Sequence, residues 1–198
     1  MKLHYSPTSP YVRKVMACAI ARGIDGQVER VETNPHASPA GLLADNPLSK
    51  VPCLVTDDGL ALFDSPVICE YLDSVGDERP LFPAAGAARW RALRQQALGD
   101  GIMDAAVGVR MEQGRPQEAA RDAAMARNRM VVERALDLLE SDVPIQHVDI
   151  GTLALACALG YLDLRFAADA WRTGRPRLAA WYEGMAARPE LTRTAPPT

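Results

Sequence analysis

The spacing of apolar positions changes twice within the first 32 residues of the chain. Residues 2–5 form a short strand-like run, and residues 10–22 repeat apolar side chains with the 3.6-residue period of a helix. Gly23 stands where such a helix ends, and residues 27–32 then mix apolar and polar positions as a half-buried strand does. Strand, helix and strand in this short span predict a βαβ unit with a parallel pair of strands.

A second group of elements follows a proline-rich loop. Residues 41–45 have a helical pattern, and residues 51–56 and 60–63 are strand-like on either side of the turn Asp57-Asp58-Gly59, which predicts a β-hairpin. Residues 66–75 return to a helical period that stops at Gly76. The element order βαβαββα is therefore expected to be complete by residue 75.

The rest of the chain shows helical patterns at residues 88–113, 117–141, 149–169 and 175–188, separated by prolines. We expect an α/β domain over residues 1–76, a linker over residues 77–86 and an all-α domain over residues 87–198. Residues 149–166 are apolar nearly all round and predict a central buried helix, with Asp149 capping its start. The tail, residues 192–198, is expected to be loosely ordered.

The composition limits the classes of function that we expect for this chain. Hydrophobic residues make up 48% of the chain and charged residues 24%, as in ordinary globular proteins. The net charge of −3 with dispersed basic residues argues against nucleic acid as a partner and favours a small ligand. The sequence starts with a strand-like run, and no apolar run reaches membrane-spanning length, so we expect a cytoplasmic protein without membrane association.

The cysteines and histidines predict no metal site. Cys18, Cys53, Cys69 and Cys157 occur singly in helical or apolar surroundings, so we expect reduced, buried, structural thiols. The three histidines do not fall at ligand spacing with one another or with the cysteines.

The first candidate for chemistry is the corner between the first strand and the first helix. Ser9, next to Thr8, precedes Pro10 at the start of the helix, where serine is a favoured cap and proline costs no hydrogen bond. A hydroxyl beside the positive end of a helix also suits an anion or a thiolate. On this fragment alone, simple capping of the helix is favoured over a catalytic role.

Two further motifs have both structural and functional interpretations. In Lys50-Val51-Pro52 the proline begins a strand, and a cis bond there would turn the backbone of Val51 outwards to pair with an extended peptide. At Asp64-Ser65 a helix begins, which offers a carboxylate for an ammonium group and a hydroxyl with N–H groups for a carboxylate. An α-amino acid end would fit that pair, although helix capping explains it equally well.

Together, S-P-T-S-P-Y-V-R-K-V, N-P-L-S-K-V-P-C-L and F-D-S-P-V-I-C-E-Y-L resemble, in this order and spacing, bacterial glutathione S-transferases with a serine at the active site. The helical half resembles the family in W-R-A-L-R-Q-Q-A-L-G-D-G-I-M-D-A and A-L-A-C-A-L-G-Y-L-D-L-R. The resemblance implies a thioredoxin-like N-terminal domain that carries the glutathione site and a helical domain that forms most of the second-substrate site. One departure is Gln146, where the family's cap before the buried helix usually carries Ser or Thr.

The resemblance also implies roles for individual residues. Ser9, or its neighbour Thr8, would hydrogen-bond the glutathione sulfur and favour the thiolate, which is the nucleophile. The tripeptide itself would be bound by a group of residues along the motifs: the backbone of Val51 before a cis Pro52, Asp64 and Ser65 at the γ-glutamyl end, and Lys50 with His36 at the glycine carboxylate.

The implied function is a homodimeric glutathione transferase that adds the thiolate to a small apolar electrophile, with a role in detoxification. An isomerase or dehalogenase of the same fold and a glutathione-binding protein without turnover are the alternatives, while the absence of cysteine at position 9 argues against thiol transfer. Helical spacing suggests an electrophile pocket at Met103, Val107, Arg110 and Met111, although such a stripe more often belongs to a buried core. Tyr11 and Trp171 are further candidates for this pocket.

Overall fold

Four strands form a mixed sheet with the order β2-β1-β3-β4 in the computed structural model, which describes residues 1–197. The strands are β1 (Lys2–Tyr5), β2 (Glu29–Glu32), β3 (Cys53–Val55) and β4 (Ala61–Leu62). β1 and β2 pair in parallel, while β3 is antiparallel to both β1 and β4. The predicted βαβ unit and the predicted hairpin are both confirmed.

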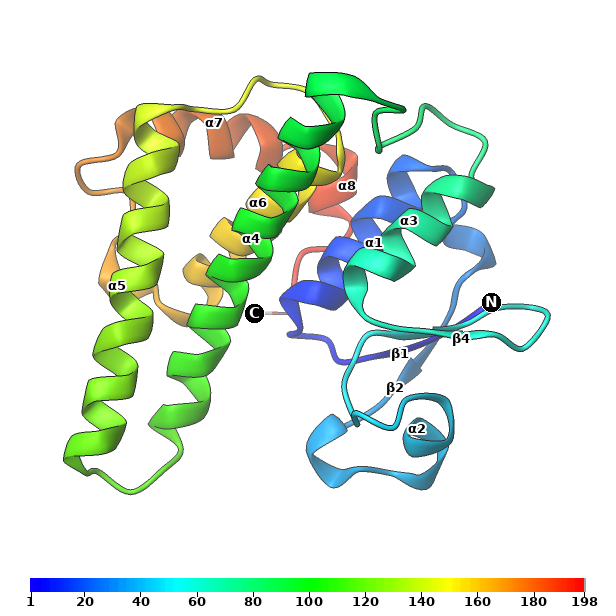
Figure 1. Ribbon diagram of the computed structural model, residues 1–198, viewed down its shortest axis with the longest axis horizontal. Helices are drawn as coiled ribbons and strands as arrows, with labels where there is room; N and C mark the ends of the chain where they lie inside the picture. The colour runs from blue at the N-terminus through cyan, green and yellow to red at the C-terminus, as the bar shows by residue number, and fades with distance from the viewer. Residues whose placement is uncertain (198) are drawn as a thin grey trace.

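The helices of this half lie on the two faces of the sheet. Helices α1 (Pro10–Ala21) and α3 (Ser65–Val75) pack side by side over one face, and α2 (Ala40–Asp45) lies beyond the other (Figure 1). Short 3₁₀ turns η1 (Asp25–Gln27) and η2 (Pro35–Ala37) flank β2. The observed order confirms βαβαββα.

The second half is helical throughout its described length. Its elements are α4 (Gly86–Gln113), α5 (Ala119–Ser141), α6 (Ile150–Arg165), η3 (Ala167–Asp169), α7 (Pro176–Ala186) and α8 (Pro189–Thr192). Helix α6 lies behind α4 in the view of Figure 1 and packs against both α4 and α1. Every residue of α6 from Ile150 to Leu162 is buried, which confirms the central helix predicted from its apolar sequence.

Several predicted boundaries are wrong. The strand expected at 27–32 starts only at Glu29, because residues 25–27 form a 3₁₀ turn. The strands expected at 51–56 and 60–63 shorten to 53–55 and 61–62, and the helix expected at 149–169 ends at Arg165 before a separate 3₁₀ turn. Pattern alone places element ends less securely than element types.

Glycines let α4 and α6 approach closely. A Cβ atom on Gly99 of α4 would lie 2.7 Å from the backbone carbon of Ala154 in α6, and one on Gly151 of α6 would lie 2.6 Å from the Ala92 oxygen in α4. Real Cβ atoms do not pack at such distances. The two helices therefore depend on glycine at both positions for their present separation.

The start of α6 confirms the predicted cap at Asp149. Asp149 is the N-cap and forms a capping box with Thr152, whose backbone N–H donates to Asp149 Oδ1 over 2.8 Å. Gln146 lies before the helix, and its side-chain amide donates to the Trp181 oxygen at 2.8 Å. The helix is thus fully capped three residues later than the family pattern suggested, and Gln146 does not weaken it.

The two halves are joined by a buried ion pair. Lys14 of α1 is completely buried, and its Nζ lies 2.5 Å from Oδ1 of Asp100 in α4. The pKa of Asp100 is nevertheless raised, because burial outweighs the neighbouring lysine. Because Lys14 is fully buried, its charge depends on the partly exposed Asp100 carboxylate.

The tail is better fixed than its composition predicted. Leu191 is buried, Thr194 Oγ1 donates to the Glu190 oxygen at 2.7 Å, and Arg193 pairs with Asp25 near β2. The prediction of loose order is therefore wrong for residues 192–194, and Thr198 lies outside the described residues. Over residues 1–197, none of the helices has the length and hydrophobicity needed to cross a membrane.

Candidate functional site

Strand register brings the three sequence motifs to one edge of the sheet. In the β1–β3 pair His4 opposes Cys53, so continuing this antiparallel register sets the end of β1 against Pro52 and Val51. In the β3–β4 pair Leu54 opposes Leu62, and the same continuation sets Pro52 against Asp64. The loop to Ser9 leaves β1 at this edge. Motifs separated by more than 40 residues thus meet in space.

Ser9 is the N-cap of α1. Its backbone is extended, and its Oγ accepts a 3.3 Å hydrogen bond from the Val12 N–H. Pro10 opens the helix directly after it, as the sequence predicted. Ser9 and Thr8 are both partly exposed, so either hydroxyl is available to a ligand at the positive end of α1.

The Lys50-Val51-Pro52 segment is held by Asn46. The Val51–Pro52 peptide bond is cis, as anticipated. The buried Asn46 donates from Nδ2 to the Lys50 oxygen at 2.9 Å and accepts at Oδ1 from the Leu48 N–H at 3.0 Å. Sequence reasoning missed this residue, although Asn-Pro before the motif is a turn signal that could have indicated it.

His36 and Lys50 lie on connected loops. The Ser49 hydroxyl donates to the Pro35 oxygen at 2.9 Å, and it lies 2.9 Å from the Ser38 hydroxyl, which ties the η2 turn to the segment before Val51. Both His36 and Lys50 are exposed. Their side chains are therefore free to meet the outer end of a ligand bound along this edge.

Asp64 and Ser65 occupy the start of α3. Asp64 is the N-cap by backbone position, but its side chain makes no capping hydrogen bond and is exposed. Ser65 is buried at the first turn of the helix. The carboxylate therefore faces outwards beside free helix N–H groups, an arrangement that suits a group carrying both an ammonium and a carboxylate.

A small depression lies beside Ser9. It is formed by the loop before α1, by α6 and by the C-terminal tail. Its walls are Pro7, Thr8, Ser9, Pro10, Arg13, Cys157, Gly160, Tyr161, Leu164, Thr194 and Pro196. Sequence reasoning missed the contributions of α6 and the tail, because it interpreted α6 only as a buried structural helix and expected the tail to be loosely ordered.

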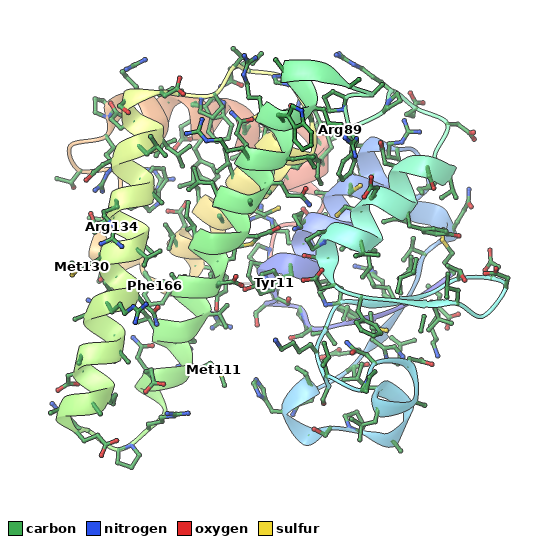
Figure 2. All side chains as sticks on the ribbon, viewed as in Figure 1. Tyr11, Arg89, Met111, Met130, Arg134 and Phe166 are labelled. Atoms are coloured by element: carbon green, nitrogen blue, oxygen red, sulfur yellow. The ribbon has the colours of Figure 1, made fainter. Side chains whose placement is uncertain are left out.

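The six residues predicted for an electrophile pocket do not gather in one place. Met103 is fully buried in the core, and Trp171 lines a different cavity between α4, α5 and α6, so the prediction is wrong for these two. Val107 is half-buried, while Arg110 and Met111 are exposed on α4. Figure 2 shows Met111 towards the lower end of α4 and Phe166 beside α5.

Tyr11 reaches from α1 to α4 and donates a hydrogen bond to Asp104 (Figure 2). Burial raises the pKa of Tyr11, and the Asp104 carboxylate raises it further, so the phenol stays protonated at neutral pH. Burial likewise raises the pKa of Tyr161, against the opposing effect of the Arg165 and Arg110 guanidinium groups. Two neutral phenols therefore stand near Ser9 on its helical side.

The cysteines are free and buried, as predicted. Cys157 is the thiol that lines the depression beside Ser9, and burial raises its pKa to about 11. It is therefore protonated at neutral pH and a poor nucleophile. Within residues 1–197, no three His, Cys, Asp or Glu side chains cluster as metal ligands would.

Residues 8–75 match the family described as glutathione S-transferase, N-terminal domain. The uncharacterised GST-like protein YibF of Escherichia coli (strain K12) is 37% identical over 202 residues, which span 100% of this chain and 99% of YibF.

Solved structures of the same family are also similar to this chain over its full length. A glutathione transferase family member from Pseudomonas fluorescens Pf-5 with bound glutathione is 43% identical, with a TM-score of 0.95 over 100% of this chain and 99% of that one. A second structure from that organism, with bound S-(propanoic acid)-glutathione, is 40% identical with a TM-score of 0.90 over the whole of both chains. By full-length similarity and by fold, the chain belongs to the glutathione S-transferase family.

Proposed function

We propose that this protein binds glutathione along the sheet edge and activates it as a thiolate for attack on an electrophile. The observation that carries the proposal is the convergence of Ser9, Val51 and Asp64-Ser65 at one edge through the strand register. Two solved structures from Pseudomonas fluorescens Pf-5, 43% and 40% identical, hold glutathione or a glutathione thioether, which supports the same ligand here.

Ser9 is the proposed thiolate stabiliser. A free thiol has a pKa near ~8.5, and each unit by which it falls corresponds to about 1.4 kcal/mol. A hydroxyl donor and the N-terminal end of α1 both favour the charged sulfur. Ser9 already accepts from the Val12 N–H, which leaves its own proton free to donate to the sulfur. Thr8 is the alternative donor.

The remaining residues hold the tripeptide. Backbone groups of Val51 pair with the central cysteinyl residue, and Asp64 with Ser65 binds the γ-glutamyl end through its ammonium and carboxylate. Lys50 reaches the glycine carboxylate from its exposed loop, with His36 beside it. In this arrangement the sulfur lies between the two held ends, next to Ser9.

The proposed reaction is conjugation: the sulfur forms a bond to an electrophilic carbon. The thioether bound in the 40% identical relative is a product of that type. We further propose that the protein is cytoplasmic, works as a homodimer and serves detoxification, as the family resemblance implied. The site generates a thiolate, and an isomerase or dehalogenase would use the same thiolate.

The test compares binding and turnover in one preparation. Glutathione binding is measured by calorimetry, and conjugation is measured with aryl halides, epoxides and maleyl compounds in the parent and in Ser9→Ala. If glutathione binds and the rate of conjugation falls at least about a hundredfold in Ser9→Ala, the result supports a transferase. Binding without turnover against any electrophile would instead identify a glutathione-binding protein.

A further inference from the structure

His4 is a buried polar side chain of β1, and neither the strand pattern nor the candidate site accounts for it. It is 5% exposed, whereas its neighbour Leu3 lies in the main hydrophobic core. Successive residues of a strand point to opposite faces of the sheet, so His4 points away from that core. It therefore points to the face beyond which α2 lies (Figure 1), and it contacts Asp45 of that helix.

Both ring nitrogens of His4 have partners. Nε2 lies 2.8 Å from Oδ2 of Asp45 at the end of α2, and Nδ1 lies 3.0 Å from the hydroxyl of Thr33, directly after β2. The bond from His4 lowers the pKa of Asp45, which is therefore a carboxylate at neutral pH and accepts the proton of Nε2. Lys2 reaches the same carboxylate oxygen at 3.2 Å, but its side chain is 42% exposed, so solvent screens this second contact.

The two partners of His4 stand near the two ends of one segment, residues 33–51. This segment carries several residues that we propose to bind glutathione, namely His36, Lys50 and Val51. Asp45 is followed by the buried Asn46, whose Nδ2 donates to the Lys50 oxygen at 2.9 Å, directly before Val51. The contact between His4 and Asp45 is therefore followed, one residue along the chain, by the hydrogen bond that holds the backbone at Val51.

Hydrophobic packing contributes little to the position of this segment. Within α2, all six residues of which the structure describes, only Leu42 is buried. A short helix with one buried apolar side chain gains little free energy from packing on a sheet. Its polar contacts to the sheet, through Asp45, therefore determine where the segment lies.

We propose that His4 is a positioning residue for glutathione: it holds residues 33–51 in the orientation that binds the tripeptide. This inference rests on the proposed function. An orientation that is populated only part of the time lowers the apparent affinity in proportion to the populated fraction, and it leaves the bound complex unchanged. Loss of the His4 contacts should therefore weaken glutathione binding without changing the activation of the sulfur, because Ser9 caps α1 on the other face of the sheet (Figure 1).

The experiment compares His4→Phe with His4→Gln. Phenylalanine fills a similar space without hydrogen-bonding groups, whereas the amide nitrogen of glutamine reaches the position of Nε2 and can still donate to Asp45. His147→Phe is the matched control, because His147 makes a similar contact before α6, with 2.7 Å between its Nε2 and Oδ2 of Asp149. Calorimetry measures glutathione binding, thiolate absorbance at saturating glutathione measures the pKa of the bound thiol, and urea unfolding measures stability.

The dissociation constant of glutathione is expected to rise about tenfold in His4→Phe and less than about threefold in His4→Gln. In His147→Phe it should equal that of the parent, whatever happens to stability. The pKa of the bound thiol should be the same in all four proteins. If His4→Phe does not unfold cooperatively, His4→Asn replaces it with the same expected loss, because the shorter amide reaches Thr33 but not Asp45.

Three results would overturn the inference: parent-like affinity without the His4 contacts, an equal loss of affinity in His4→Gln, or an equal loss in His147→Phe. A changed pKa of the bound thiol in His4→Phe would also overturn it, since His4 would then act on the sulfur. In each of these cases the parent still binds glutathione and the proposed function stands. A parent that does not bind glutathione would overturn the proposed function, and this inference with it.

Discussion

The two walls of the candidate site differ in the parts of the chain that form them. The wall on the sheet side consists of strand ends and helix starts, where backbone groups and short polar side chains at Ser9, Val51 and Asp64 face outwards. The opposite wall consists of side chains such as Arg13 and Tyr161, which come from separate helices and the tail. A wall made of backbone groups binds one kind of ligand, because its hydrogen-bonding groups are set by the fold. A wall made of side chains can acquire a different ligand specificity by substitution, without a change of fold.

The largest effect is expected where the two halves of the chain are joined, at the Lys14–Asp100 ion pair. Replacing Asp100 by Ala leaves the fully buried Lys14 without its counter-charge. An uncompensated buried charge costs about 3–5 kcal/mol, so the free energy of unfolding in urea should fall by that amount. The double variant Lys14→Met, Asp100→Leu removes both charges and should recover most of it. A single variant as stable as the parent would show that the pair does not join the halves.

The helix packing beneath the second wall gives the next largest effect. Gly99→Ala places a Cβ atom 2.7 Å from the backbone of α6, and we expect a loss of about 1–3 kcal/mol in the free energy of unfolding. Gly101→Ala, two residues along the same helix, meets nothing within 4 Å and should be neutral or stabilising by up to about 1 kcal/mol. Equal thermal midpoints for the two variants would contradict this account of the α4–α6 contact.

The sheet-side wall is expected to respond in affinity and not in stability. Asp64→Ala removes the exposed carboxylate proposed for the γ-glutamyl ammonium, and calorimetry should show about tenfold weaker glutathione binding. Asp77→Ala, another exposed carboxylate just beyond α3, should bind as the parent does. If both variants lose affinity equally, general electrostatics and not a specific contact would explain the loss.

The smallest effect is expected on stability at acid pH, through Asp45 and its contacts with strand β1. A hydrogen bond with His4 lowers the pKa of Asp45, and Lys2 at 3.2 Å lowers it further. The folded state therefore binds fewer protons than the unfolded state near pH 4, so this contribution is present above about pH 4 and is lost as the pH falls through the lowered pKa.

Asp45→Asn should therefore be less stable than the parent by less than about 1 kcal/mol at pH 7, and the difference should shrink as the pH falls through the lowered pKa of Asp45. Urea unfolding at several pH values measures it. A difference that persists unchanged at pH 2.5 would assign the effect to packing.

The contrast between the walls also explains what the sequence could predict. Ser9 before Pro10, Val51 before Pro52 and Asp64 before Ser65 are local signals, because the backbone conformation at each is set by its immediate neighbours. Their convergence follows from the element order, since strand ends of one sheet meet at an edge. Local reasoning therefore located these three segments, whereas the binding roles proposed for them came from the family resemblance and stay a prediction.

The other wall required tertiary information. Met103 and Met111 were grouped by their helical spacing, but spacing alone does not tell which face of α4 is buried. Met103 lies in the core, and only tertiary packing decides this. Arg13 and Tyr161 lie far apart in sequence, and the tail meets them because Leu191 docks against the core. No local motif marks such an arrangement.

The most direct test of the central claim is the pKa of the glutathione thiol when bound, followed by the ultraviolet absorbance of the thiolate against pH. In the parent protein the account predicts a pKa at least about one unit below the free value near ~8.5, and in Ser9→Ala a return towards that value with glutathione still bound. Thr8→Ala, measured beside it, tells which hydroxyl is the donor. A parent complex whose thiol titrates as free glutathione does would contradict the claim that the start of α1 activates the sulfur.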